Sequence, residues 1–267
     1  MEIMVPIFVI SGLGIVFGLG LSYASKVFAV PVDERVSRVR ELLPGANCGA
    51  CGFSGCDGLA EAIVNDGAPA GRCPVGGAAM VSAVSEVMGV EEGSVEVTVA
   101  RVICQGDYTN TGRKYNYDGI EDCNAANLLA AGMNACAYGC LGLGSCSRVC
   151  PFDAIVVENG LARVLPDKCT GCGKCVNICP KGIIKQVPVL TGFTVTCASQ
   201  EKGGIARKQC KTACIGCQKC VRVCPSNAVT VENNVARIDA AKCINCGQCS
   251  EVCPQKCIGN YMAKRLA

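Results

Sequence analysis

The stretch CTGCGKCVNICP, residues 169–180, separates four cysteines by two, two and three residues and places a proline after the last one. The same pattern recurs as CIGCQKCVRVCP at 214–225 and as CINCGQCSEVCP at 243–254. An irregular version, CAYGCLGLGSCSRVCP, spans 136–151 and carries Leu143 where the regular runs have their second cysteine. Three regular matches in one chain exclude coincidence.

This spacing is typical of the bacterial cysteine run that binds two [4Fe-4S] clusters, in which each fourth cysteine ligates the other cluster of the pair. Structural zinc sites also use paired thiolates, but they need neither the interleaved spacing nor the proline. Cysteines two residues apart also suit one metal centre better than disulfide bridges. The runs therefore predict an electron carrier. A zinc or disulfide scaffold is the alternative, and such a protein would be colourless.

The composition excludes several other functions. The chain has 25 cysteines among 267 residues and no histidine, so it can form neither a Rieske centre nor a Ser-His or Cys-His catalytic pair. It contains no P-loop, and no glycine fingerprint between a strand and a helix, so we expect no nucleotide site. A net charge of +3 is too small to indicate a nucleic-acid partner. We therefore expect no catalytic residues in this chain.

One segment is long and apolar enough to cross a lipid bilayer. Residues Ile3 to Ser25 carry no charge, and about 20 apolar residues span the hydrocarbon core. A cleaved signal peptide would begin with a basic region, which is missing here. Positive charges instead follow the segment, at Lys26, Arg35, Arg38 and Arg40. The positive-inside rule therefore predicts a single-pass protein of the cell membrane with its cysteine-rich domains on the cytoplasmic side.

Within this segment, Gly14 and Gly18 form a GxxxG pattern. Such a pattern indicates close contact with another membrane helix, although glycine is also common in membrane helices generally. Because one span cannot form a pore, ion movement would require other chains.

We predict an α+β protein with five segments. They are a transmembrane helix at 1–27, a small helical four-cysteine iron–sulfur domain at 28–85, a linker with a strand at 86–132, and two tandem ferredoxin-type modules at 133–190 and 191–267. The strand is expected over Ser94 to Ile103, a helix over Cys56 to Val64, and hairpins over Val156 to Arg163 and Thr230 to Arg237.

The cross-ligation rule assigns 20 cysteines to five [4Fe-4S] clusters. The four-cysteine domain uses Cys48, Cys51, Cys56 and Cys73. The first module uses Cys150 with Cys169, Cys172 and Cys175, and Cys179 with Cys140, Cys146 and, in place of Leu143, Cys136. If Cys136 does not reach the iron, this site would hold a three-iron cluster. The second module uses Cys253 with Cys214, Cys217 and Cys220, and Cys224 with Cys243, Cys246 and Cys249.

Five cysteines remain. Cys257 takes a position held by alanine or isoleucine after the other Cys-Pro pairs, which favours a buried packing role. The others could hold a sixth cluster, and they are Cys104, Cys123, Cys197 and Cys210. Because Cys123 and Cys197 precede Cys136 and Cys210 by the same number of residues, they belong to the internal repeat. Nothing in the sequence shows that the four thiols meet.

The chain as a whole resembles the B subunits of the Rnf complex. The motifs that carry the resemblance are CGACGFSGC at 48–56, KYNYDGIEDC at 114–123 and the irregular run at 136–146. The resemblance implies a subunit that accepts electrons from soluble ferredoxin. It would work with other membrane and peripheral subunits, in a complex that couples electron flow between ferredoxin and NAD+ to Na+ or H+ movement. Many family members have one ferredoxin module, whereas this chain has two.

A basic segment fits a ferredoxin dock. Between residues 200 and 223 the sequence has one acidic residue and six basic ones. The basic residues are Lys202, Arg207, Lys208, Lys211, Lys219 and Arg222. A positive surface would steer an acidic partner toward the chain, although an ordinary solvated face would look the same. The alternative function is an electron donor to a corrinoid or carbon-metabolism enzyme, which the membrane span disfavours.

Overall fold

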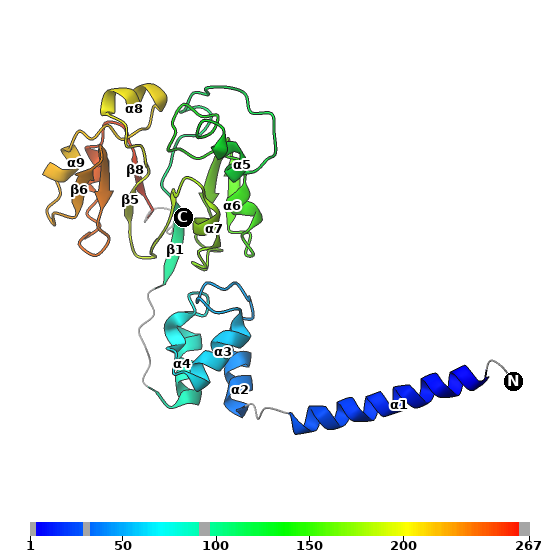
Figure 1. Cartoon of the computed structure of the whole chain (residues 1–267). Coiled ribbons are helices and arrows are strands. Elements are labelled where there is room, and N and C mark those ends of the chain that lie inside the picture. The colour runs from blue at the N-terminus through cyan, green and yellow to red at the C-terminus, as the bar shows by residue number, and fades with distance from the viewer. Residues whose placement is uncertain (1–3, 29–32, 91–96, 262–267) are drawn as a thin grey trace.

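The computed structural model describes residues 4–28, 33–90 and 97–261, and the side chains of residues 4–9 are not included in that description. Helix α1 (Met4–Val27) extends away from the rest of the chain (Figure 1). Its described side chains are almost all exposed, and residues Ile10–Val27 are apolar and long enough to cross a membrane. The predicted span is therefore one exposed apolar helix; Ile3, where the prediction began, lies outside the described residues.

The four-cysteine domain is a small helical unit, as predicted. It contains α2 (Glu34–Leu42), α3 (Cys56–Asn65), a 3-10 turn (Ala70–Arg72) and α4 (Gly77–Met88). Apolar side chains from all three α-helices pack into one core, in which Val39, Leu59 and Val84 are at most 1% exposed. Helix α4 runs to Met88, past the predicted boundary at residue 85, because its last turns supply part of that core.

The first module is built around two pairs of antiparallel strands. Strand β1 (Thr98–Val102) pairs with β4 (Ile184–Pro188), and β2 (Ile155–Glu158) pairs with β3 (Leu161–Val164). Three short helices, α5 (Cys123–Leu128), α6 (Ser145–Arg148) and α7 (Lys174–Ile178), carry cysteines beside the strands. The predicted strand is confirmed as β1, although residues 94–96 lie outside the described residues. The predicted linker therefore contributes both β1 and α5 to the module.

The second module repeats this plan. Strand β5 (Phe193–Val195) pairs with β8 (Ile258–Asn260), and β6 (Val229–Glu232) pairs with β7 (Val235–Ile238). Its helices are α8 (Gly203–Gln209), α9 (Lys219–Arg222) and α10 (Gln248–Glu251). Both predicted hairpins are confirmed. Each turns through two residues of positive φ, Asn159-Gly160 and Asn233-Asn234, as tight hairpin turns require.

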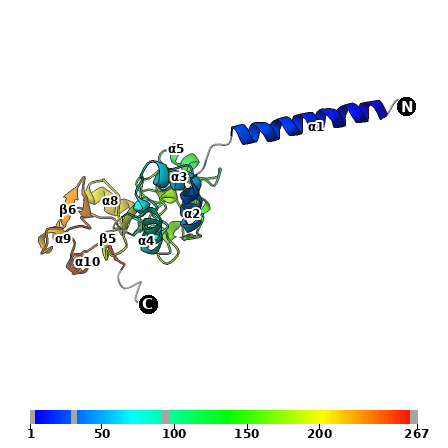
Figure 2. The ribbon, with the colours of Figure 1, turned by 90° about the horizontal axis from the view of Figure 1, so that it is seen from below.

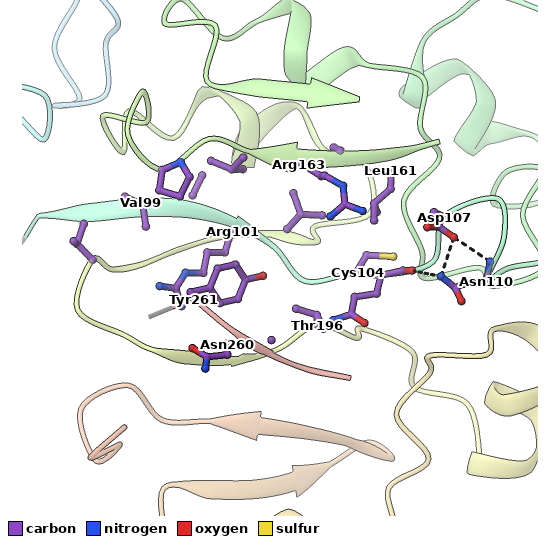
Figure 3. Close-up of a pocket in the computed structure, with 18 residues that line it drawn as sticks. Val99, Arg101, Cys104, Asp107, Asn110, Leu161, Arg163, Thr196, Asn260 and Tyr261 are labelled. Atoms are coloured by element: carbon purple, nitrogen blue, oxygen red, sulfur yellow. Dashed lines mark hydrogen bonds between the residues drawn. The ribbon is translucent and has the colours of Figure 1, made fainter. Parts of the chain in front are cut away.

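The two modules lie side by side above the four-cysteine domain (Figures 1 and 2). Arg101 of β1 joins them: its side chain donates hydrogen bonds to Thr194 Oγ1 at 2.7 Å and to the Thr191 carbonyl, and it lies 4.2 Å from the ring centre of Tyr261. A cavity of about 390 Å³ opens at this junction, with Arg101 and Tyr261 on one side and Cys104 near Asp107 and Asn110 on the other (Figure 3). The modules are thus fastened to each other through β1.

Candidate iron–sulfur centres

The thiols of the four-cysteine domain gather at the loops beside its helices. Cys56 begins α3 and Cys73 follows the 3-10 turn, and both are buried in the helical core. The thiols of Cys48 and Cys51 lie near enough to Cys73 to act on it electrostatically. Asn47 fixes the loop, since its Oδ1 accepts a hydrogen bond from the Cys56 backbone N–H at 2.8 Å. The predicted four residues are therefore brought together.

The first module encloses two separate groups of thiols. One cavity is lined by Cys150 together with Cys169, Cys172 and Cys175, the set that cross-ligation predicts. The other is lined by Cys140, Cys146, Cys179 and Cys123. Cys123 begins α5, and its backbone N–H donates to Ser145 Oγ at 2.8 Å, which ties this helix to the start of α6. Cys123 therefore occupies the place for which the sequence suggests Cys136.

The second module follows the cross-ligation pattern. One cavity is lined by Cys214, Cys217, Cys220 and Cys253, and Cys257 lines the same cavity. In the last group, Cys249 lies near enough to Cys243, Cys246 and Cys224 for their thiols to act on it electrostatically. Cys257 is 2% exposed and its Sγ lies 3.6 Å from that of Cys253. Its counterparts Ala154, Ile183 and Ala228 are equally buried, which agrees with a packing role for Cys257.

A further cavity lies where the two modules meet, and four of its lining residues are cysteines. They are Cys104, Cys136, Cys197 and Cys210. Three of these belong to the sixth site suggested by the sequence, but Cys136 is present where Cys123 was expected. The two cysteines have exchanged places relative to that prediction. The reason is the excursion between Cys104 and Cys136, which folds back over the first module and delivers Cys123 to that module's own cavity.

Backbone N–H groups already point at several of the sulfurs. Ala100 N lies 3.4 Å from Cys169 Sγ, Ala228 N lies 3.3 Å from Cys224 Sγ, and Ala236 N lies 3.5 Å from Cys214 Sγ. Such donors stabilise a sulfur that carries negative charge, and donors of this kind tune metal-bound thiolates. The donor set of sulfurs without histidine also suits an iron–sulfur cubane. The residues present therefore fit the clusters that the cysteine spacing implies.

Burial opposes the charged form of these thiols. Loss of solvation raises the pKa of Cys104 and of Cys146 to about 12, and that of Cys175 and of Cys197 to about 11. A buried thiolate requires a compensating positive charge, which bound iron supplies. Among the described residues, no three thiols or carboxylates converge closely enough to hold a single metal ion. Four groups of thiols, two in the first module, one in the second and one at the junction, line cavities.

Comparison with known proteins identifies the family. Over 257 residues, 51% of positions are identical to the B subunit of the Na(+)-translocating ferredoxin:NAD(+) oxidoreductase complex of Acetobacterium woodii, covering 96% of this chain and 77% of that protein. The chain belongs to the family of Rnf complex B subunits. It is also 47% identical to the B subunit of the proton-translocating ferredoxin:NAD(+) oxidoreductase complex of Clostridium ljungdahlii, over 85% of this chain and 81% of the relative. The B subunit of an ion-translocating oxidoreductase complex of Methanosarcina acetivorans is 42% identical, over 94% and 95% of the two chains.

Family models agree with the iron–sulfur assignment of this Rnf protein. A putative Fe-S cluster family matches residues 43–75, and the LdpA Fe-S cluster-binding domain matches 136–190. Two 4Fe-4S dicluster domain models match 168–229 and 207–254. The chain is therefore an iron–sulfur electron-transfer subunit of an ion-translocating oxidoreductase complex, and its apolar helix associates it with the membrane. The colourless scaffold and the corrinoid-enzyme donor are set aside.

Proposed function

We propose that this chain carries electrons, one at a time, between soluble ferredoxin and the other membrane and peripheral subunits of a ferredoxin:NAD+ oxidoreductase complex. The observation that carries the proposal is the grouping of the cysteines into separate four-thiol sets that extend from the second module to the domain beside the membrane helix. Because one helix forms no pore, Na+ or H+ would cross through other subunits. The basic residues after α1 favour a cytoplasmic location for the cysteine-rich domains.

The observed groups support the binding of five [4Fe-4S] clusters. Their ligands are Cys48, Cys51, Cys56 and Cys73; Cys150, Cys169, Cys172 and Cys175; Cys123, Cys140, Cys146 and Cys179; Cys214, Cys217, Cys220 and Cys253; and Cys224, Cys243, Cys246 and Cys249. When bound, each cluster accepts and releases one electron. The protein supplies the thiolates, the N–H donors and an apolar wall, and it supplies no acid or base for the reaction.

The groups nearest the membrane helix are close to each other. The thiol of Cys48 acts electrostatically on that of Cys172, so the four-cysteine domain adjoins a cluster site of the first module. At the opposite end, Cys217 and Cys246 are the two exposed cysteines among the described residues. Electrons would therefore enter or leave through the second module, far from the membrane helix, and exchange with membrane subunits near the four-cysteine domain.

The basic segment contains one exposed thiol, that of Cys217. Lys219 and Arg222 are on α9, two and five residues after Cys217, and Lys208 is on α8. The side chains of these three residues are exposed. A positive surface beside a cluster attracts an acidic carrier and raises its rate of association, and salt screens that attraction. We therefore place the ferredoxin dock on α8 and α9.

The test measures the rate at which reduced ferredoxin transfers electrons to the chain, as a function of ionic strength. The triple variant Lys208→Glu, Lys219→Glu and Arg222→Glu should react at least about tenfold more slowly at low salt and lose most of its salt dependence. The matched control reverses Lys168 and Lys185, which are exposed on the first module. An unchanged salt dependence in the triple variant would reject the dock. No reduction of the unaltered chain by ferredoxin would reject the function itself.

A further inference from the structure

We propose that Cys104, Cys136, Cys197 and Cys210 ligate a sixth [4Fe-4S] cluster, which lies between the two ferredoxin modules and connects their cluster pairs. The proposal rests on the proposed function, because it adds a centre to the same electron path. It differs from the set suggested by the sequence, in which Cys123 stood in place of Cys136.

The two modules contribute equivalent halves of this site. Cys104 follows the end of β1 by two residues, and Cys197 follows the end of β5 by two residues. These strands correspond to each other, since each pairs with the last strand of its own module. Likewise, Cys136 precedes Cys140 by four residues and Cys210 precedes Cys214 by four residues, and Cys140 and Cys214 each line a cavity of their own module. Each module thus supplies one thiol after a strand and one thiol from the loop before its cluster-binding run.

The hydrogen bonds repeat the same symmetry. Cys140 N donates to Cys104 Sγ at 3.4 Å, and Cys214 N donates to Cys197 Sγ at 3.2 Å. Each sulfur also accepts a hydrogen bond from the backbone N–H two residues after its own cysteine. Gly106 N lies 3.3 Å from Cys104 Sγ, and the Ser199 backbone donates to the Cys197 sulfur. The two modules share one plan, and both place a thiol with two backbone donors at this position. Equivalent use in both modules indicates a common function as ligands.

Contacts across the junction hold the two halves together. Thr111 forms a β-bridge with Cys210, and Lys211 N donates to the Asn110 carbonyl at 2.9 Å. Gly106 lies between the two halves: a Cβ built on it would lie 3.5 Å from Cys210 Sγ and 3.6 Å from Cys104 Sγ. The sulfurs of residues far apart in the sequence therefore flank one small space.

The remaining two sulfurs are also provided with donors. Backbone groups of Tyr138 and Gly139 hydrogen-bond to the Cys136 sulfur, and Thr212 Oγ1 lies 3.4 Å from Cys210 Sγ. All four sulfurs can thus act as acceptors, the role of a thiolate bound to iron. The sixth site also adjoins a ligand residue of each neighbouring centre, Cys140 on one side and Cys214 on the other. An electron leaving one module would reduce the sixth cluster, and its reoxidation would pass that electron to the other module.

The experiment counts iron and acid-labile sulfide in the full-length chain, purified anaerobically in detergent, and records the EPR spectrum of the reduced protein. The unaltered chain should contain about 24 irons, and both the double variant Cys104→Ala with Cys136→Ala and the double variant Cys197→Ala with Cys210→Ala should contain about 20. The quadruple variant should also contain about 20 irons, because all four thiols serve one cluster. The matched control is Cys257→Ala, which should keep all of the iron.

Two results would overturn the proposal. About 20 irons in the unaltered chain, with no loss in either double variant, would mean that these thiols bind no cluster. A quadruple variant with clearly less iron than either double variant would place the thiols in two different sites. In both cases the other five clusters could remain, so the electron-relay function would stand. A chain with almost no iron would instead reject that function together with the sixth site.

Discussion

At the scale of single residues, the first module departs from the regular cysteine pattern at Leu143. Leu143 stands where each regular run has its second cysteine, and Cys123 lines the cavity that this change leaves one thiol short. The variant Cys123→Ala should therefore lose up to one cluster, about four irons. Adding Leu143→Cys to that variant should restore the iron, because it recreates the regular spacing.

The measurement is iron per chain together with the EPR signal of any three-iron cluster. The control is Cys136→Ala with Leu143→Cys. If Cys136 were the ligand of this centre, Leu143→Cys would rescue the Cys136 variant and would leave the Cys123 variant deficient. That outcome would return the two cysteines to the positions suggested by the sequence.

At the scale of elements, β1 connects the modules through one buried side chain. Arg101 is 6% exposed and donates hydrogen bonds to Thr194 and Thr191, across the junction. Replacement by leucine should weaken the docking by about 3–6 kcal/mol, because it removes two hydrogen bonds of a charged group, each worth about 1.5–3 kcal/mol. We expect faster limited proteolysis within residues 188–192, which link the modules.

Arg163→Leu is the control, since Arg163 is half exposed and its contact with Glu158, at 3.5 Å, is a surface ion pair. Equal cleavage of the two variants would contradict a docking role for Arg101.

Elements formed by local sequence could be predicted, and contacts between distant segments could not. The helix from Cys56 and both hairpins follow from spacing, turn residues and periodicity over short ranges. The exchange of Cys123 and Cys136 depends instead on how a long excursion folds. The internal repeat equates Cys123 with Cys197, but the strand pairing equates Cys104 with Cys197. The signal that could have identified the correct set is that Cys104 and Cys197 take equivalent positions after β1 and β5. It could not be read from the sequence, because β5 is too short to show a clear strand periodicity.

For the whole molecule, the decisive property is continuity of the electron path. The exposed thiols lie in the second module, and the membrane helix precedes the four-cysteine domain at the other end. If the site at the junction holds a cluster, its removal should leave a gap between two intact halves. The rate of electron transfer falls steeply with distance, so electrons from ferredoxin should then accumulate in the second module.

Rapid mixing with reduced ferredoxin, followed by freezing and EPR, would measure this. In the variant with Cys197→Ala and Cys210→Ala, the two clusters of the second module should be reduced as fast as in the unaltered chain. Reduction of the first module and of the four-cysteine domain should be slower by about tenfold or more, equivalent to about 1.4 kcal/mol in the barrier. The control Cys257→Ala should reduce all clusters at the normal rate. Normal reduction of the first module in the double variant would show that electrons enter it directly, and the two modules would then be parallel branches rather than one path.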